Sequence, residues 1–252
     1  MVDFYQRYQA CMHVYQQSKR VWAELLSLGG DIHQEPIFEE ANRVVKDTMI
    51  RVKENVATLI DRLYDLGYAF TFPEEVWVRP APDIASILDQ IEREFGLLPR
   101  SLRGWYEVVG SVNFIGNHPE INFYDQVSYE GWDSFQCYPD PLVIAPIQPK
   151  LSSYFLNDVY EEEGIEITTP PYSVILAPDA THKANHSGGG PTQVMIPNPR
   201  MDAPLISDEW DGFLFMNYLQ TCFDWGGFPG WRFNPNYPRE ILNFLTKDLM
   251  FL

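Results

Sequence analysis

The first 66 residues repeat one spacing of side chains twice, and this repeat restricts the fold more than any other feature of the sequence. In each stretch, apolar or small side chains alternate four and three positions apart, which places them in one stripe along an α-helix. The stripe residues are Phe4, Tyr8, Cys11, Tyr15, Ser18, Trp22 and Leu25, and then Val45, Met49, Val52, Val56, Leu59, Leu63 and Leu66. The glycines at 29–30 suit the left-handed end of a helix. The spacing therefore predicts an antiparallel helical hairpin over residues 3–66.

Two helices can hide only one face each against the other, so the hairpin needs a further surface to cover it. The stripes can interlock within the chain and pack on its own remaining residues. Alternatively, a second copy of the chain covers them, which predicts a homodimer through residues 3–66. Both alternatives follow from the same pattern.

The rest of the chain changes from helical spacing to alternation and back again. Helices are expected at 84–95 and 99–109, and further helices at 208–224 and 238–249. Between them, short strands bounded by Pro, Gly, Asn and Asp are expected at 112–114, 142–147, 165–168, 173–176 and 193–196. Helices followed by strands and then helices indicate an α+β fold with an antiparallel sheet.

A proline-rich stretch separates the two patterns. Pro80 and Pro82 stiffen the chain, and the alternating residues before them suggest a short hairpin or an extended connector. We therefore expect a helical extension over residues 1–70, a connector over 71–83 and an α+β domain over 84–252.

The charge of the chain excludes several classes of partner. Its 18 Lys and Arg are outnumbered by 35 Asp and Glu, which gives a formal charge of −17. Such a chain repels nucleic-acid backbones and anionic lipid headgroups. We expect neither a nucleic-acid nor a membrane partner, because no apolar run approaches the roughly 18 residues of a membrane span. Three isolated cysteines and a start without a signal-peptide pattern indicate the cytoplasm.

Catalytic motifs give no strong signal, and no cofactor is expected. A triple glycine at 188–190 lacks the Lys of a phosphate-binding loop. Asp179, His182 and His186 are the only closely spaced set that resembles metal ligands. Lys183 lies among them and would repel a cation, so a structural or surface role is the main interpretation. A metal-dependent enzyme that uses these three residues is the alternative.

Acidic residues concentrate in the middle of the chain. Residues 104–182 hold 12 acidic side chains against one basic side chain, Lys150, whereas residues 1–70 hold 10 acidic and 8 basic ones. This block either keeps the protein soluble or forms an acidic face that captures a basic protein. The run Glu161, Glu162 and Glu163 is most simply a solvated turn, and it would contribute to such a face.

From residue 84 to 228 the order of features resembles the SUKH superfamily of cell-wall-synthesis regulators and toxin-immunity proteins. The likeness rests on a helix before Gly96-Leu97-Leu98-Pro99, the pair Trp105-Tyr106, the strand entry Asp140-Pro141-Leu142, and Asp179 followed by His182-Lys183-Ala184-Asn185 and Ser187-Gly188-Gly189. It continues from Leu214 to Gly227-Phe228-Pro229-Gly230. The resemblance implies a mainly antiparallel, twisted sheet flanked by helices, and protein binding without catalysis. The hairpin at 3–66 is not part of the common domain.

These observations lead to one functional hypothesis with two alternatives. The chain is expected to be a non-enzymatic, acidic protein-binding module, in its most specific form an immunity protein that neutralises a basic toxin. The alternatives are the metal-dependent enzyme and a dimeric structural adaptor. The residues expected to carry function are Asp179, His182, Lys183, Asn185, His186, Glu161, Glu162 and Glu163.

Overall fold

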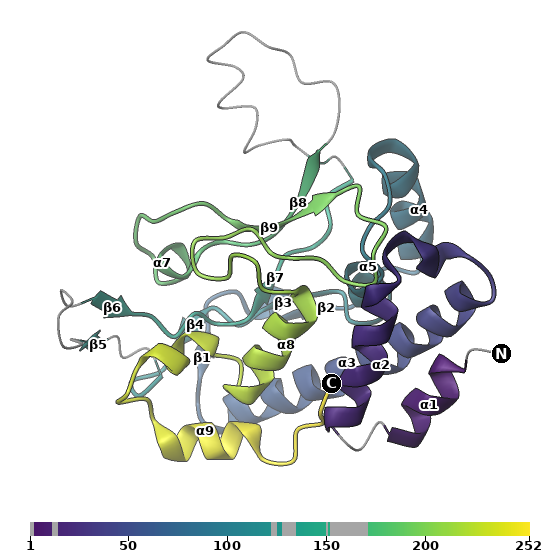
Figure 1. Ribbon diagram of the computed structural model, residues 1–252. Helices are drawn as coiled ribbons and strands as arrows, with labels where there is room; N and C mark the ends of the chain where they lie inside the picture. The colour runs from purple at the N-terminus through teal and green to yellow at the C-terminus, as the bar shows by residue number, and fades with distance from the viewer. Residues whose placement is uncertain (1–2, 12–14, 122–124, 128–134, 150, 152–170) are drawn as a thin grey trace, which may run out of the picture.

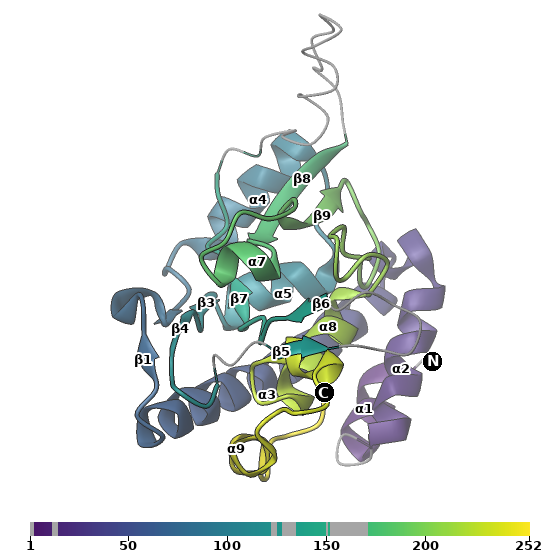
Figure 2. The same cartoon turned by 90° about the vertical axis from the view of Figure 1, so that its left-hand side faces the viewer.

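The computed structural model describes residues 3–11, 15–121, 125–127, 135–149, 151 and 171–252 (Figures 1 and 2). The helices are α1 (Phe4–Cys11), α2 (Tyr15–Ser27), η1 (Gly29–His33), α3 (Ile37–Asp65), η2 (Pro73–Glu75), α4 (Ile84–Phe95), α5 (Arg100–Val108), α7 (Ala180–Lys183), α8 (Phe215–Asp224), η3 (Pro229–Phe233) and α9 (Arg239–Thr246). The strands are β1 (Ala69–Phe70), β2 (Trp77–Val78), β3 (Ser111–Asn113), β4 (Gly116–Asn117), β5 (Asp125–Val127), β6 (Phe135–Cys137), β7 (Val143–Ile144), β8 (Tyr172–Ala177) and β9 (Thr192–Ile196). The expected α+β class is confirmed. Where the structure describes the chain, no helix is both long enough and apolar enough to cross a membrane.

The N-terminal helices carry the two stripes that the sequence predicts. Tyr8 and Leu25 are fully buried, as are Met49 and Leu59 on α3. The structure differs in one respect, because the first expected helix is divided into α1 and α2. Helix α1 packs against both α2 and α3. The four–three spacing continues across the division because each piece turns its own apolar face to the same core.

The core that covers these stripes comes from the chain itself. Helix α3 packs on α5 and α9, and one cluster of buried apolar side chains runs from Phe4 to Leu252. The C-terminal residues lie along α3, where the Asn55 side chain donates to the Met250 carbonyl and accepts from the Met250 N–H, both at 2.8 Å. The stripes are therefore used within the chain, which is the first of the two expected arrangements.

The strands form small antiparallel sheets. They pair as β1–β4, β2–β3–β7, β5–β6 and β8–β9, with Val112 opposite both Trp77 and Ile144. The Ala145 N–H donates to the Leu176 carbonyl at 2.6 Å, which connects the end of β7 to β8. Four of the five expected strands are confirmed as β3, β7, β8 and β9, and the fifth, at 165–168, lies outside the described residues.

The stretch expected to be a hairpin or connector takes the second form. Strands β1 and β2 do not pair with each other, because β1 pairs with β4 and β2 with β3. The stretch therefore joins the N-terminal helices to two different sheets. The division of the chain at residues 71–83 remains a prediction.

Helices α4 and α5 match their expected ranges to within one residue, whereas α8 begins later than expected and α9 ends earlier, at Thr246 and not at 249. Helix α4 ends at Gly96, whose φ of 95° lies in the region that favours glycine. Helix α8 begins at Phe215 and not at 208, because the preceding residues form a turn in which the Ser207 hydroxyl accepts from the N–H groups of Glu209 and Trp210. Cys11, Cys137 and Cys222 are buried, and no disulfide joins them in the described part of the chain.

Candidate functional site

The predicted residues Asp179, His182, Lys183, Asn185 and His186 lie on and around α7, the short helix between β8 and β9 (Figure 1). Asp179 is the N-cap of this helix, and its Oδ1 accepts from the N–H groups of Thr181 at 2.9 Å and His182 at 3.1 Å. The carboxylate is 2% exposed. Burial disfavours its charge, but hydrogen bonds from His182 and Thr181 outweigh this and hold the pKa of Asp179 below its ordinary value.

The two histidines beside Asp179 have separate partners. The His182 ring bonds the Asp179 carboxylate through Nδ1 and is 49% exposed, so a buried acid orients an accessible imidazole. The His186 Nδ1 lies 2.9 Å from the Ala184 carbonyl oxygen, and its ring lies 5.7 Å from that of Tyr138. Asn185 is exposed and has a φ of 62°, which suits its place in the turn after α7.

These positions bear on the alternative of a metal site. Among the described residues, no group of three or more His, Cys, Asp or Glu side chains is placed to hold a metal ion. Asp179 Oδ2 and His182 Nδ1 are hydrogen-bonded to each other. The His186 ring contacts the Ala184 carbonyl and the Tyr138 ring instead of these two residues. The spacing that suggested three ligands reflects a capped helical turn followed by a loop.

Lys183 faces the interior and anchors α7 to another part of the chain. Its Nζ lies 2.5 Å from Asp140 Oδ1, and both side chains are almost completely buried. The Trp210 indole N–H donates to Asp140 Oδ2 at 2.9 Å. A buried ion pair whose remaining oxygen is hydrogen-bonded fixes the relative positions of the segments that contribute to it. Lys183 is thus a structural residue of this site.

Part of the expected acidic face lies outside the described residues. Glu161, Glu162 and Glu163 lie outside the described residues, as does Lys150. Of the described acidic side chains of the block, Asp140 and Asp179 are buried within the network of α7. These two carboxylates serve the fold and are not available to a partner.

The structure adds a set of exposed side chains beside α7 that the sequence did not reveal. Arg232 on η3 lies over three aromatic rings, with its guanidinium carbon 4.1 Å from the centroid of Trp210, 5.0 Å from that of Phe213 and 4.3 Å from that of Phe233. Trp210 is buried, whereas Phe213 and Phe233 are 37% and 41% exposed. Two aromatic rings are therefore presented to solvent on a base of buried side chains.

The turn that carries Phe213 is attached directly to α7. The Glu209 carboxylate accepts from the Ala180 N–H at 3.3 Å, and a side chain at Gly189 would collide with the carboxylate of Asp208. Asp208 and Asp211 are exposed. We call this surface the α7 face and define it by His182, His186, Asp208, Asp211, Phe213 and Phe233.

The sequence did not predict the α7 face, because residues 208–224 were expected to form one helix. The signal that could have located the face is Ser207 followed by Gly212, which is typical of a hydroxyl-capped turn that ends in a glycine with positive φ. The contacts of Arg232 have no such local signal.

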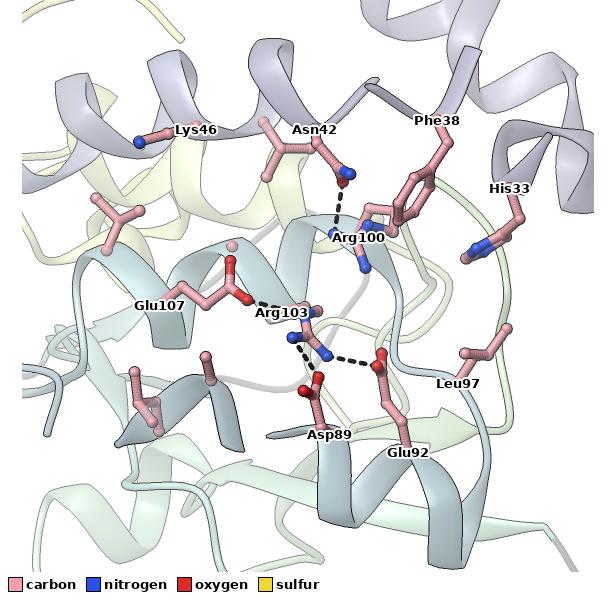
Figure 3. Close-up of a pocket in the computed structure, with 15 residues that line it drawn as sticks. His33, Phe38, Asn42, Lys46, Asp89, Glu92, Leu97, Arg100, Arg103 and Glu107 are labelled. Carbon is pink, nitrogen blue, oxygen red and sulfur yellow. Dashed lines mark hydrogen bonds and ion pairs between the residues drawn. The ribbon is translucent and has the colours of Figure 1, made fainter. Parts of the chain in front are cut away.

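A second feature absent from the expectations is a cleft between α3 and the pair α4 and α5 (Figure 3). Arg103 lies in it and bonds three carboxylates, those of Asp89 at 2.7 Å, Glu107 at 2.8 Å and Glu92. Burial disfavours the charge of Arg103, but these partners outweigh it and raise its pKa. Arg100, one turn earlier, lines the same cleft.

Comparison with known proteins gives no match that bears on this site. No family model matches the chain, and neither a curated protein nor a solved structure matches it. The SUKH resemblance accordingly stays a prediction.

Proposed function

We propose that this chain is a non-enzymatic protein-binding module of the cytoplasm that docks through the α7 face onto a partner rich in basic side chains. In its most specific form it is an immunity protein, and the partner is a basic toxin domain. The observation that carries the proposal is the pair of exposed rings, Phe213 and Phe233, which both contact Arg232.

Exposed aromatic rings on a fixed base suit the centre of a protein interface. Aromatic and arginine side chains dominate binding energy at such centres because they bury a large area with little loss of conformational freedom. The base under Phe213 is fixed by Trp210, which packs edge-on against Phe213 and bonds Asp140. The face is thus organised before a partner arrives, which reduces the entropic cost of association.

Charge favours a basic partner. Asp208 and Asp211 are exposed in the same turn as Phe213, and the half-buried Glu209 lies between them. Burial raises the pKa of Glu209. The chain as a whole carries a formal charge of −17, which accelerates encounter with a positively charged surface and repels acidic proteins.

The test uses the product of the neighbouring reading frame. If that frame encodes a toxin with a basic C-terminal domain, this domain and the full chain are mixed in a titration calorimeter. We expect Phe213→Ala and Phe233→Ala each to weaken binding at least about tenfold, as for truncated rings at an interface centre. Phe72→Ala is the matched control, because Phe72 is 45% exposed and lies outside the α7 face.

A salt series on the same pair separates charge from aromatic packing. We expect association to slow steeply between low and physiological ionic strength, because the screening length falls from about 30 Å at 0.01 M salt to about 8 Å at 0.15 M. Binding that is insensitive to both salt and the two phenylalanine substitutions, or equally sensitive to Phe72→Ala, would refute the proposal.

A further inference from the structure

The cleft between α3, α4 and α5 has the size of a site for a small molecule. Its volume is about 680 Å³, within the range of roughly 300–1,000 Å³ that is usual for such sites. Figure 3 shows Asn42 and Lys46 on one wall and the carboxylates of Asp89 and Glu107 on the other. Apolar side chains, among them Phe38, Ile84 and Leu97, complete the lining.

The two arginines of α5 that line the cleft, Arg100 and Arg103, differ in their partners. Arg103 has three carboxylate partners, so its positive charge is more than neutralised. Within the described part of the chain, the guanidinium of Arg100 has one hydrogen-bond partner, the Asn42 Oδ1 at 2.5 Å, which is a neutral amide oxygen. Among the described residues, no carboxylate forms an ion pair with Arg100.

This lack of a counter-charge is costly because Arg100 is buried. The residue is 8% exposed, and its Nε has no hydrogen-bond partner among the described residues. Its guanidinium carbon lies 5.1 Å from the centroid of the Phe38 ring, a contact that offsets only part of the lost hydration. A buried arginine usually meets a carboxylate or phosphate through two parallel hydrogen bonds.

We propose that the cleft binds a small organic molecule through a carboxylate group at Arg100, with its aliphatic body on the apolar lining. A singly charged carboxylate is favoured over phosphate, because Asp89, Glu92 and Glu107 line the same cleft and repel a doubly charged anion. This site shares no residue with the α7 face, so its test is independent of the test of the protein-binding function.

The ligand class is tested with three probes on the full chain, by titration calorimetry. The probes are 4-methylpentanoate, 3-methylbutan-1-amine and inorganic phosphate: the amine keeps the aliphatic body and replaces the carboxylate with a cation, and phosphate is an anion without an aliphatic body. We expect saturable binding of one 4-methylpentanoate per chain. The amine and phosphate are expected to bind at least tenfold more weakly.

Variants of the two residues that meet in the cleft assign the binding to Arg100. Asn42→Asp replaces the amide that Arg100 already contacts with a carboxylate, which can pair with the guanidinium. The variant should therefore bind 4-methylpentanoate at least tenfold more weakly and have a higher melting temperature. Arg100→Met should abolish binding. If Arg100→Met does not fold, Asn42→Asp still tests the role of Arg100. Arg43→Met, a half-exposed arginine of α3 outside the cleft, is the matched control and should bind as the parent does.

Three results would overturn the proposal. They are the absence of saturable 4-methylpentanoate binding to the parent chain, equal binding of the amine, and unchanged affinity in Asn42→Asp.

Discussion

Three buried aspartates of the described chain are stabilised in three different ways. Asp140 has the cation of Lys183, and Asp179 caps α7 and holds His182. Asp202 has only neutral donors, which are the Ser101 hydroxyl at 2.6 Å and the N–H groups of Ala203 and Met216. Burial therefore dominates at Asp202 and raises its pKa to about 6 from an ordinary value of 3.8, although these hydrogen bonds oppose the change.

The pKa of Asp202 predicts how stability depends on pH. Between about pH 4 and pH 6 the unfolded chain releases this proton while the folded chain keeps it, so the free energy of unfolding falls as the pH rises. A difference of two pKa units corresponds to about 3 kcal/mol. In Asp202→Asn this contribution is removed, and urea unfolding at several pH values should show a flatter profile for the variant than for the parent. Parallel profiles would contradict the prediction.

At the scale of elements, the packing of α5 on α3 depends on one missing side chain. A Cβ at Gly104 would lie 2.2 Å from Cγ1 of Val45 and 3.4 Å from Cγ of Met49. Real atoms do not approach so closely, so the glycine sets the distance between the two helices. The same helices form the walls of the cleft in Figure 3.

This contact predicts a compensating pair of substitutions. Gly104→Ala should destabilise the fold by about 1–3 kcal/mol through overpacking, and Val45→Ala by about 2 kcal/mol through the loss of two buried methyl groups. In the double variant the new methyl occupies the vacated space, so the combined loss should be smaller than the sum. Chemical unfolding of the four proteins gives the coupling energy, and strict additivity would show that the two side chains do not meet.

The elements that the sequence predicted are those whose signals are local. The stripe of α3 and the bounds of α4 follow from helical spacing and from Gly96. The closeness of Asp179 and His182 also follows from spacing, since residues three apart share a helical turn. The contacts of Asp140 with Lys183 and Trp210 span 43 and 70 positions and have no local signal, and so neither they nor the α7 face could be predicted.

For the whole molecule, the continuous core joins the two ends of the chain. The Arg51 guanidinium donates to the Phe251 carbonyl at 2.7 Å, and that of Arg62 to the Leu245 carbonyl at 2.7 Å, beside the pair of bonds between Asn55 and Met250. Helix α3 therefore supports residues nearly 200 positions away.

A continuous core predicts one cooperative unfolding transition for the full chain. Asn55→Leu removes both hydrogen bonds to Met250 and leaves buried backbone groups without partners, so we expect a loss of about 2–4 kcal/mol. Because all parts share the core, helix content and tryptophan signals should fall together in the parent and the variant. Two separate transitions would instead support independent units on either side of residues 71–83.

The position of Trp210 makes its fluorescence sensitive to the surroundings of Arg232. Its indole is 2% exposed and lies against Arg232 while its N–H is held by Asp140. Indole emission responds to the electric field of nearby charges, and Arg232 also contacts the two exposed rings of Phe213 and Phe233. If the proposed partner binds those rings and displaces Arg232, the fluorescence of Trp210 should change although the partner does not touch the indole.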